Sequence, residues 1–495
     1  MVNDQFKCHL KSYPQDNYLE YVKNIIDSEQ TILNIFNDYQ GQQEEFQEYI
    51  KTKILNNPQQ LEENLQQTYQ QWNQQFKISL TRKEIFTLII LMYYGLLERD
   101  FSMGGFYIIN MKSIRQSQNY LSQQKLKCIK NYIKLFYIYK DTIQNQSVVF
   151  SKNSVNKDEF LGKYENSNYQ NIDFEFTKLK NEDHKNSTVV DFADQNIGGL
   201  VLDTRNCAQE EIVMLIFPEA IVSMIFIPQM TEIEAVLIEN LKKYSNYTGY
   251  EQTFQSFPPQ DLNESYNLLA IDAKPFYSEN QFTEENIYRE LIKSYAGFEL
   301  SIKNQPNCYI STGRWGCGIF RGDPILKTLI QFLSFAIAIN QVKPINQKII
   351  INCVTDQQLF SFGKQLEEQL KQKGIQLNLI NLKKAISYLQ NYQLQALNQN
   401  EYIKINTIYE ILTEDIPQIE EKVQDNKDQI QFQDAQENQR IIDQSQEVPQ
   451  NQIEPRSEPQ DPQNNKTNFK KGTQLIVAIV AISIIGYKVK KFLQK

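Results

Sequence analysis

The sequence predicts an α/β fold in which helices cover both faces of a mixed sheet, giving three α/β/α layers. Between residues 150 and 390, short runs rich in valine and isoleucine alternate with longer runs that carry apolar residues at helical intervals. The strand-like runs are STVVDF, EAVLIE, NLLAID, CYIST and KIIINCV. Because such apolar strands need cover on both faces, we expect helices on both sides. Ligands bind such sheets in the loops that lead from strand ends to helices.

Residues 1–145 predict an all-helical N-terminal domain, and residues 146–395 form the predicted α/β domain. In the N-terminal part, ILMYYGLLERDF and KLKCIKNYIKLFYIYKD carry apolar residues at helical intervals with few glycines or prolines between them. The stretch from Lys125 to Lys140 is basic and amphipathic. We expect it to pack on a neighbouring helix with its lysines in water, and binding to a membrane surface is the alternative.

A change of composition near residue 398 marks the end of the α/β domain. The run EYIKINTIYEILTEDI (401–416) still carries enough apolar residues for one more short element. Beyond it the chain is rich in glutamine, asparagine, glutamate and proline, so it cannot bury enough apolar surface to offset the entropy of the chain. We therefore expect residues 398–470 to form a disordered linker.

Residues 472–489 predict a C-terminal transmembrane helix that serves as a tail anchor. The stretch from Gly472 to Tyr487 carries no charge, and lysines flank it on both sides: Lys470, Lys471, Lys488, Lys490 and Lys491. It is shorter than the ~20 residues of a full span, but flanking lysines can extend to both interfaces. A buried core helix is the alternative, which the preceding linker disfavours. A short span suits a thin membrane, so we expect the cytoplasmic face of the endoplasmic reticulum or the mitochondrial outer membrane.

The overall charge and the scattered cysteines argue against several classes of protein. The 495 residues carry a net charge of −8 with a pI near 5.3, which argues against electrostatic coating of nucleic acid, so we expect no direct DNA binding. Six cysteines without a CxxC pair, and two histidines, indicate neither a zinc site nor a disulfide framework. We expect reduced thiols in a cytosolic setting, no metal and no organic cofactor.

The triplet Gln209-Glu210-Glu211 is the strongest candidate for chemistry. It follows a buried strand-like run and the pair Gly198-Gly199, and it opens the apolar run IVMLIF. Acidic residues at the start of a helix interact favourably with its positive end, so an ordinary charged first turn is one interpretation. Two neighbouring carboxyls that converge raise each other's pKa, which suits acid catalysis on a sugar, and this is the other interpretation.

This stretch resembles the signature of the poly(ADP-ribose) glycohydrolase family, in which a glycine loop is followed at fixed spacing by Gln-Glu-Glu. Five further segments resemble the family in the same order across residues 80–355: LTRKEIFTLIILMYYGLLERD, YSNYTGY, LLAIDA, YRELIKSYAGFE and STGRWGCGIFRGDPILKTLIQFL. One glycine-rich loop can match by chance, whereas ordered segments make a specific signal. The resemblance implies a macrodomain-like catalytic domain preceded by a helical accessory domain.

The resemblance also implies a glycoside hydrolase that cleaves the ribose–ribose O-glycosidic bonds of poly(ADP-ribose) and releases ADP-ribose. Cleavage needs a proton on the departing oxygen and stabilisation of an oxocarbenium-like centre. Glu211 would be the general acid/base, Glu210 would hold the ribose hydroxyls, and Gln209 would orient that pair. The other substrate-binding residues implied by the resemblance are Asp194, Gly198, Gly199, Tyr250, Gly316, Gly318 and Phe320.

Two glycine loops would bring backbone N–H groups close to the pyrophosphate of the substrate, because glycine lacks a Cβ. Tyr250 would lie over the ligand and close the site, with a core tyrosine as the alternative. Asp191 matches a further acid of the family pattern, whereas Asp272 is expected only to brace the sheet.

Four departures from the family pattern fall on the expected ligand contacts. Leu200 stands where the family has a third glycine, and Asp194 stands where it has asparagine. The second loop has substitutions where the family tends to have asparagine, alanine and glycine: Arg314, Ile319 and Arg321. An arginine there would strengthen phosphate binding or fill the site. Val354 aligns with the aromatic expected to stack on adenine, and losing that stack would cost on the order of 1 kcal/mol.

Three hypotheses follow: an active glycohydrolase with altered substrate contacts, a membrane-tethered module that binds ADP-ribose or poly(ADP-ribose) with little or no catalysis, and a tail-anchored scaffold that binds no nucleotide. The intact triplet favours the first. A pure binding module does not need Glu210 and Glu211, whereas an efficient enzyme is not expected to carry Leu200 and Arg321. The partners we expect are poly(ADP-ribose) or ADP-ribosylated proteins, bound by a monomer.

Overall fold

The structure, a computed structural model, describes residues 8–10, 20, 23–24, 26, 42–99, 108–167, 170–259, 261–395 and 405–416. The chain divides into two compact units, Met1–Gln418 and Ile419–Lys495, and all described residues lie in the first. The predicted transmembrane helix at 472–489, and the predicted linker beyond residue 416, lie outside the described residues.

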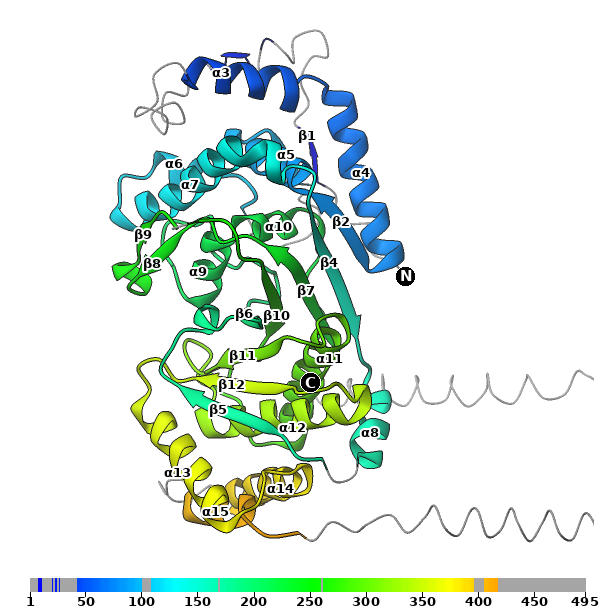
Figure 1. The fold of residues 1–495 in the computed structure, drawn as a ribbon. Coiled ribbons are helices and arrows are strands. Elements are labelled where there is room, and N and C mark those ends of the chain that lie inside the picture. The colour runs from blue at the N-terminus through cyan, green and yellow to red at the C-terminus, as the bar shows by residue number, and fades with distance from the viewer. Residues whose placement is uncertain are drawn as a thin grey trace, which may run out of the picture. The chain divides into compact units, whose positions relative to one another are not determined.

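An eight-stranded mixed sheet forms the centre of the first unit (Figure 1). In spatial order its strands are β2 (Lys77–Thr81), β4 (Ser147–Ser154), β7 (Glu234–Leu241), β10 (Tyr266–Asp272), β6 (Ser187–Ala193), β11 (Tyr309–Gly313), β12 (Lys348–Asn352) and β5 (Asp173–Thr177). Neighbours from β2 to β10 pair antiparallel, and neighbours from β10 to β5 pair parallel. All five predicted strand-like runs belong to this sheet, so the prediction of a mixed sheet is confirmed.

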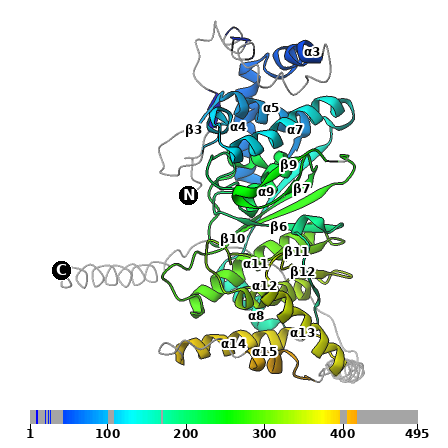
Figure 2. The ribbon, with the colours of Figure 1, turned by 90° about the vertical axis from the view of Figure 1, so that its left-hand side faces the viewer.

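Helices cover both faces of the sheet (Figures 1 and 2). One face carries α5 (Arg82–Tyr94), α7 (Tyr120–Ile143) and α9 (Gln209–Ile216), and the other carries α11 (Glu284–Asn304) and α12 (Pro324–Val342). Along β10, Leu268 and Ala270 belong to the apolar core of the first group, whereas Leu269 and Ile271 belong to that of the second. This alternation follows from the two-residue period of a strand. The predicted α/β/α layering is therefore observed.

The remaining elements lie around this sandwich. The further helices are α3 (Gln42–Tyr49), α4 (Pro58–Gln75), α6 (Lys112–Gln116), α8 (Lys157–Asn166), α10 (Ser223–Phe226), α13 (Gln357–Lys373), α14 (Leu379–Gln395) and α15 (Ile405–Leu412). Short helical turns are η3 (Ile50–Ile54), η4 (Asn181–Asp183), η5 (Pro218–Val222) and η6 (Glu251–Thr253). Two small antiparallel pairs are β1 (Cys8–Leu10) with β3 (Leu97–Arg99), and β8 (Asn246–Thr248) with β9 (Gln255–Phe257). The helix α15 is the short element expected at 401–416.

The N-terminal part is not all-helical, contrary to the prediction for residues 1–145. Strand β2 joins it to the main sheet by pairing antiparallel with β4. Ile78 and Leu80 are buried while Lys77 and Ser79 are exposed, which is the alternation of a strand. A run of five residues is too short to stand out beside long helical patterns. Residues on both sides of the predicted boundary at 145/146 thus share one sheet, and the boundary itself stays a prediction.

In the described part of the chain, α12 is the one helix long and apolar enough to cross a membrane. However, 78% of its apolar window is buried inside the molecule. It packs against α11 and α14, as the core helix of an α/β layer does.

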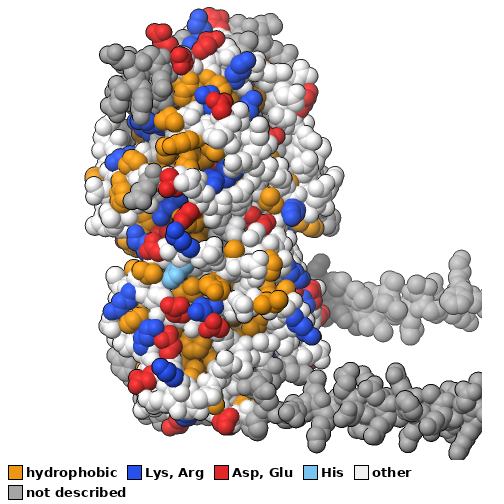
Figure 3. All heavy atoms as spheres, viewed as in Figure 1, with side chains coloured by type: hydrophobic (Ala, Val, Ile, Leu, Met, Phe, Trp, Pro, Cys, Tyr) orange, Lys and Arg blue, Asp and Glu red, His pale blue; other side chains and the backbone are white. Residues whose placement is uncertain are grey.

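The surface of the described residues has mixed charge. Acidic and basic side chains are interspersed over the face seen in Figure 3. Four large apolar side chains are about half exposed in loops that follow strands: Tyr250, Tyr277, Ile319 and Val354. Such loops are where ligands bind sheets of this kind.

Candidate active site

The candidate site lies where parallel strands end. Strands β10, β6, β11 and β12 run side by side in parallel, so their carboxyl ends meet at one edge of the sheet. The first glycine loop (194–200) follows β6, and the second glycine loop (314–322) follows β11. Val354 follows β12 in the same way. The structure therefore brings the predicted loops to a common edge.

Gln209 begins α9 and binds the end of β6. Its Oε1 accepts a hydrogen bond from the backbone N–H of Phe192 at 2.8 Å, and its Nε2 donates to the carbonyl oxygen of Val190 at 3.0 Å. These two bonds fix the start of α9 against the strand. The side-chain amide is thus bound to the protein itself, and its role in orienting the two glutamates stays a prediction.

Glu210 is buried under the first glycine loop, where it receives two backbone N–H groups. Its Oε2 accepts from Asp194 at 2.9 Å, and its Oε1 accepts from Gly198 at 2.7 Å. The side chain of Asp194 accepts from the backbone N–H of Asn196 at 2.9 Å, which shapes the same loop. These hydrogen bonds therefore fix the carboxyl of Glu210 against the first glycine loop.

Glu211 is held by the far end of the same loop and by its own helix. Its Oε1 accepts from the N–H of Leu200 at 2.9 Å, and its Oε2 accepts from the N–H of Ala208 at 2.7 Å, just before α9 begins. Within this loop, Gly198 and Gly199 have positive φ and Leu200 does not. The leucine departure therefore leaves intact a backbone contact that does not require glycine.

The glycine pair is required by conformation and by space. The φ angles are +98° at Gly198 and +46° at Gly199, in the region that glycine adopts without strain. A Cβ on Gly198 would lie 2.7 Å from Cγ of Met224, and a Cβ on Gly199 would collide with both glutamate carboxyls. The absence of side chains lets the loop pass directly over the acids.

A third carboxyl, Asp191, makes the site an acid cluster. Asp191 is fully buried on β6, and neither of its oxygens has a hydrogen-bond partner among the described residues. Burial raises its pKa well above the ordinary value, and the charge of Glu211 raises it further. Burial also raises the pKa of Glu210, with Asp191 and then Glu211 adding to the effect. Because neighbouring buried carboxyls do not all ionise together, Asp191 and Glu210 hold a proton more strongly than free carboxyls do.

Tyr250 lies beside the start of α9. Burial of part of its ring raises the pKa of the phenol, Glu251 and Glu211 raise it further, and a hydrogen bond from the backbone of Gln209 lowers it. The segment is tied down because the N–H of Glu251 donates to the carbonyl of Cys207 at 3.0 Å. With 50% of its surface exposed, Tyr250 is not a core tyrosine. The structure thus brings it to the Gln-Glu-Glu triplet.

The second glycine loop is closed by a bond from the N–H of Gly322 to the carbonyl of Gly316 at 2.8 Å. Gly316 has a φ of +71°. A Cβ on Gly318 would meet nothing within 4 Å, so this position is open. Phe320 packs on the core of α11 and α12, and its carbonyl accepts from the N–H of Phe276 at 2.9 Å. Of the three predicted residues, Gly318 is open to a ligand, and the other two shape the loop.

Arg314 and Arg321, the two arginines that differ from the family pattern, both interact with other side chains of the protein. Nε of Arg314 forms an ion pair with Oδ2 of Asp356 at 3.0 Å. The guanidinium of Arg321 lies 5.6 Å from the ring centroid of the exposed Tyr277. Arg321 and Val354 both have positive φ, +59° and +51°, which for a β-branched valine is a genuine outlier. Backbone strain of this kind occurs at functional sites.

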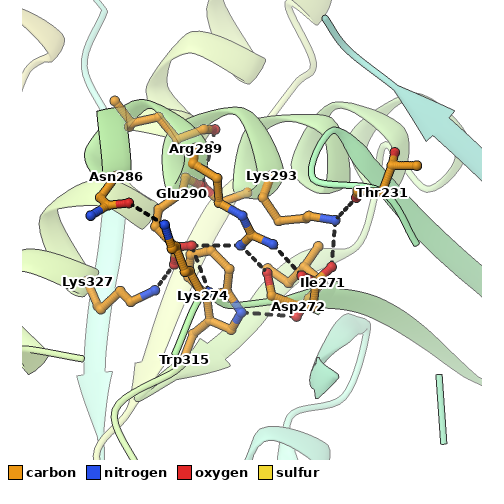
Figure 4. Close-up of polar contacts among 12 residues, drawn as sticks. Thr231, Ile271, Asp272, Lys274, Asn286, Arg289, Glu290, Lys293, Trp315 and Lys327 are labelled. Carbon is orange, nitrogen blue, oxygen red and sulfur yellow. Dashed lines mark hydrogen bonds and ion pairs between the residues drawn. The ribbon is translucent and has the colours of Figure 1, made fainter. Parts of the chain in front are cut away.

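A buried ionic cluster, which the sequence analysis missed, supports the second loop (Figure 4). Asp272, at the end of β10, pairs with Arg289 and with Lys293, the latter at 2.6 Å. Glu290 pairs with Arg289 at 2.7 Å and with Lys327. The available signal was the run YRELIKSY, which places charges within an apolar helix. Asp272 braces the sheet, as expected, through charged partners on α11.

Trp315 and Lys327 connect this cluster to the second loop. Nε1 of Trp315 donates to the carbonyl of Ile271 at 3.0 Å, and Nζ of Lys327 lies 4.0 Å from the ring centroid of Trp315. A Cβ on Gly316 would lie 3.1 Å from Nζ of Lys327. Burial lowers the pKa of Lys327 well below its ordinary value, Arg289 lowers it further, and Asp272 opposes this. The second glycine loop therefore lies directly against the buried amino group of Lys327.

These features define a class of protein: a macrodomain-like α/β fold whose strand ends carry two glycine loops and a buried cluster of carboxyls. Contrary to the expectation that the first loop presents its backbone N–H groups to a pyrophosphate, the N–H groups of Asp194, Gly198 and Leu200 bind the two glutamates. Buried carboxyls with raised pKa values suit acid catalysis on a sugar.

Comparison with known proteins finds relatives of the α/β part of the chain. Residues 161–358 match the family model described as "Poly (ADP-ribose) glycohydrolase (PARG), Macro domain fold". Poly(ADP-ribose) glycohydrolase 1 of Caenorhabditis elegans is 29% identical over 287 residues, which cover 52% of this chain and 36% of that protein. Probable poly(ADP-ribose) glycohydrolase 2 of Arabidopsis thaliana is 31% identical over 192 residues, which cover 30% of this chain and 37% of that protein. The matches thus span little more than a third of these relatives' length.

Residues 161–358 thus carry the catalytic-domain pattern of the poly(ADP-ribose) glycohydrolase family, and the resemblance seen in the sequence is confirmed there. Among solved structures, poly(ADP-ribose) glycohydrolase from Deinococcus radiodurans in complex with ADP-ribose is 14% identical, with a TM-score of 0.32, over 44% of this chain and 94% of that one. A TM-score of this size carries no argument, so the likeness rests on the family model and the sequence relatives.

Proposed function

We propose that this protein hydrolyses the ribose–ribose O-glycosidic bonds of poly(ADP-ribose) and releases ADP-ribose. The match of residues 161–358 to the family model supports the proposal, since the relatives named above are poly(ADP-ribose) glycohydrolases. The geometry of Glu210 and Glu211 under the first glycine loop supports it independently. The polymer would bind along the edge of the sheet where both glycine loops lie.

In the proposed reaction Glu211 is the general acid/base. Its protonated carboxyl gives a proton to the departing ribose oxygen as the glycosidic C–O bond breaks. The carboxylate then takes a proton from the water that adds to the anomeric carbon, which restores the acid. Glu210 would hold the ribose hydroxyls, and Asp191 would keep a proton in the cluster by raising the pKa of Glu210.

The observation that carries the proposal is the burial of both glutamates against the first loop. In an ordinary charged first turn, the acids point into water, whereas Glu210 and Glu211 are only 5% and 4% exposed. Both carboxyls face the same point above Gly199. Burial of two acids at a helix start is costly, and a catalytic role accounts for it.

The experiment incubates the full chain with poly(ADP-ribose) and follows the release of ADP-ribose. We expect release by the parent and a loss of roughly 10²- to 10⁴-fold in Glu211→Gln. Glu232→Gln, at an exposed position, is the matched control and should act like the parent. Bound polymer without release by the parent would select the binding module instead, and neither binding nor release would leave only common ancestry.

We also propose that residues 472–489 tether the domain to the cytoplasmic face of an intracellular membrane. The support is the uncharged stretch with lysines on both sides. We expect the full chain to resist extraction from membranes by carbonate, and a variant with Ile479→Arg and Ile482→Arg to be extracted. Extraction of the parent would contradict the tether, and microscopy of the tagged parent identifies the membrane.

A further inference from the structure

Lys125, on α7, is buried beside the first glycine loop, although the lysines of this helix were expected in water. Its side chain is fully buried. Its Nζ donates to the carbonyl of Leu200 at 2.9 Å and to the carbonyl of Asp203 at 2.7 Å. Both acceptors lie in the segment that connects the glycine pair to the triplet. A lysine from the N-terminal helical part thus reaches into the backbone that surrounds the candidate acids.

The residue that Lys125 binds is the residue that holds Glu211. Leu200 accepts from Lys125 through its carbonyl, and its N–H donates to Oε1 of Glu211 at 2.9 Å. No carboxylate in the described part of the chain forms an ion pair with Lys125, so its charge acts on nearby acids through space. Burial lowers the pKa of Lys125, while Cys207, Glu211 and Asp203 oppose this.

Neighbouring residues at the start of α7 bind other segments close to the candidate acids. Oε1 of Gln124 accepts from the N–H of Ser256 at 3.0 Å, and the Gln124 carbonyl accepts from Oγ of Ser256 at 3.2 Å. Ser256 lies on β9, which pairs with β8 in the hairpin that carries Tyr250. Nδ2 of Asn119 donates to the carbonyl of Thr204 at 3.4 Å. Helix α7 therefore packs on α9 and on this hairpin together (Figure 1).

We propose that Lys125 is a positioning residue for the hydrolysis: through Leu200 and Asp203 it holds the first loop in the shape that presents Glu211 to the substrate. The inference rests on the proposed function. Its structural claim, that Lys125 holds the first loop in place, can be tested without measuring catalysis. It gives the N-terminal helical part a direct role in the geometry of the active site.

The kinetic test compares Lys125→Met, Lys125→Arg and Lys127→Met in the full chain. Lys127 is exposed on the same helix and is the matched control. For Lys125→Met we expect kcat on poly(ADP-ribose) to fall roughly 10- to 100-fold with a much smaller change in KM. Lys125→Arg should recover part of the loss, and Lys127→Met should match the parent.

The pH–rate profile separates positioning from simple bracing. Five titratable groups face the acid Glu211: Asp191, Glu210, Tyr250, Cys207 and Lys125. Removing the one cation among these groups raises the pKa of the carboxyls, so the profile of Lys125→Met should move to higher pH. A lower kcat with the profile of the parent would assign Lys125 a structural role only and overturn the proposal.

Hydrogen exchange tests, independently of activity, whether Lys125 holds the first loop in place. Peptides that cover residues 194–204 should exchange faster in Lys125→Met than in the parent, and at the parent's rate in Lys127→Met. Unchanged exchange would overturn the proposal. If the parent did not cleave the polymer, the proposed function would fail while this comparison still stood. Should Lys125→Met not fold, Lys125→Leu, which also lacks a donor, carries the same comparison.

Discussion

Gly199 lies directly against Glu210: a Cβ on Gly199 would stand 2.4 Å from Oε2 of Glu210. The same Cβ would stand 2.9 Å from Oε1 of Glu211. The backbone at Gly199 also has a positive φ, which side chains disfavour. Space and conformation therefore both require glycine here, and the close approach of the loop to the two acids depends on it.

Gly199→Ala should abolish most of the activity. Because the new methyl group displaces both carboxyls, we expect the release of ADP-ribose to fall at least roughly 10²-fold. The strained backbone should also lower the free energy of unfolding by roughly 1–3 kcal/mol. Release of ADP-ribose and urea unfolding of the full chain measure the two effects.

The matched control for this change is Gly162→Ala, within α8. A Cβ there would meet nothing within 4 Å. Because alanine is a better helix former, this variant should keep full activity and gain roughly 0.5–1 kcal/mol of stability. A Gly199→Ala variant as active as the control would show that the loop does not approach the acids as described.

The parts of the fold that follow local patterns were predictable. Val189 and Val190 belong to an apolar run bounded by polar residues, and such a run forms a buried strand wherever it lies in a sheet. Gly198 and Gly199 mark the tight turn, and the acids at the start of α9 mark its first residues. Their roles in a reaction came from the family resemblance, and which carboxyl transfers the proton stays a prediction.

The buried cations of the site could not be predicted. Lysine is rarely buried unless it is paired. The helical pattern around Lys125 therefore predicts a solvated side chain, and no pattern marks Lys327 as buried. Their partners are distant in sequence: Lys125 binds carbonyls 75 and 78 positions further on, and Lys327 pairs with Glu290 on another helix. Strand β2 was missed for a related reason, since its partner β4 is separated from it by α5 and α7.

In Asp191→Asn, the free energy of unfolding should fall less steeply with rising pH than it does in the parent. The pKa of Asp191 is higher in the folded chain than in the unfolded chain, so the folded state holds more protons between those two values. Stability is then fully present below the unfolded pKa and is lost as pH rises through the folded pKa, by about 1.4 kcal/mol per pH unit for one proton. Urea unfolding from pH 5 to 9 should show a shallower decline in the variant. Parallel declines would mean that Asp191 ionises normally.

Gly318→Ala should separate ligand contact from loop stability. A Cβ at this position meets nothing within 4 Å, so stability should stay within about 0.5 kcal/mol of the parent. If ADP-ribose binds against this loop, the added methyl group should weaken its binding roughly tenfold, or about 1.4 kcal/mol. Calorimetric titration with ADP-ribose measures this, and unchanged affinity would place the ligand elsewhere.

Gly316→Ala is the contrasting variant in the same loop. Its Cβ would lie 2.6 Å from Cβ of Ala273, and the φ of +71° disfavours any side chain. We expect a loss of roughly 1–3 kcal/mol in the free energy of unfolding, together with weaker binding. Parent-like stability would show that the loop relaxes away from Ala273 and Lys327.

Arg82→Met should be strongly destabilising because it leaves a buried acid without its cation. Nε of Arg82 pairs with Oε1 of Glu219 at 2.8 Å, and both side chains are fully buried. The expected loss is roughly 3–5 kcal/mol in urea unfolding.

Because burial already raises the pKa of Glu219, the loss in Arg82→Met should be larger at pH 8 than at pH 5.5, where the acid can take up a proton. Adding Glu219→Gln should restore part of the stability, since it removes the unpaired charge and its amide oxygen can still accept from the backbone N–H of Lys242. If the double variant is no more stable than the single one, the cost arises from lost packing rather than from an unpaired charge.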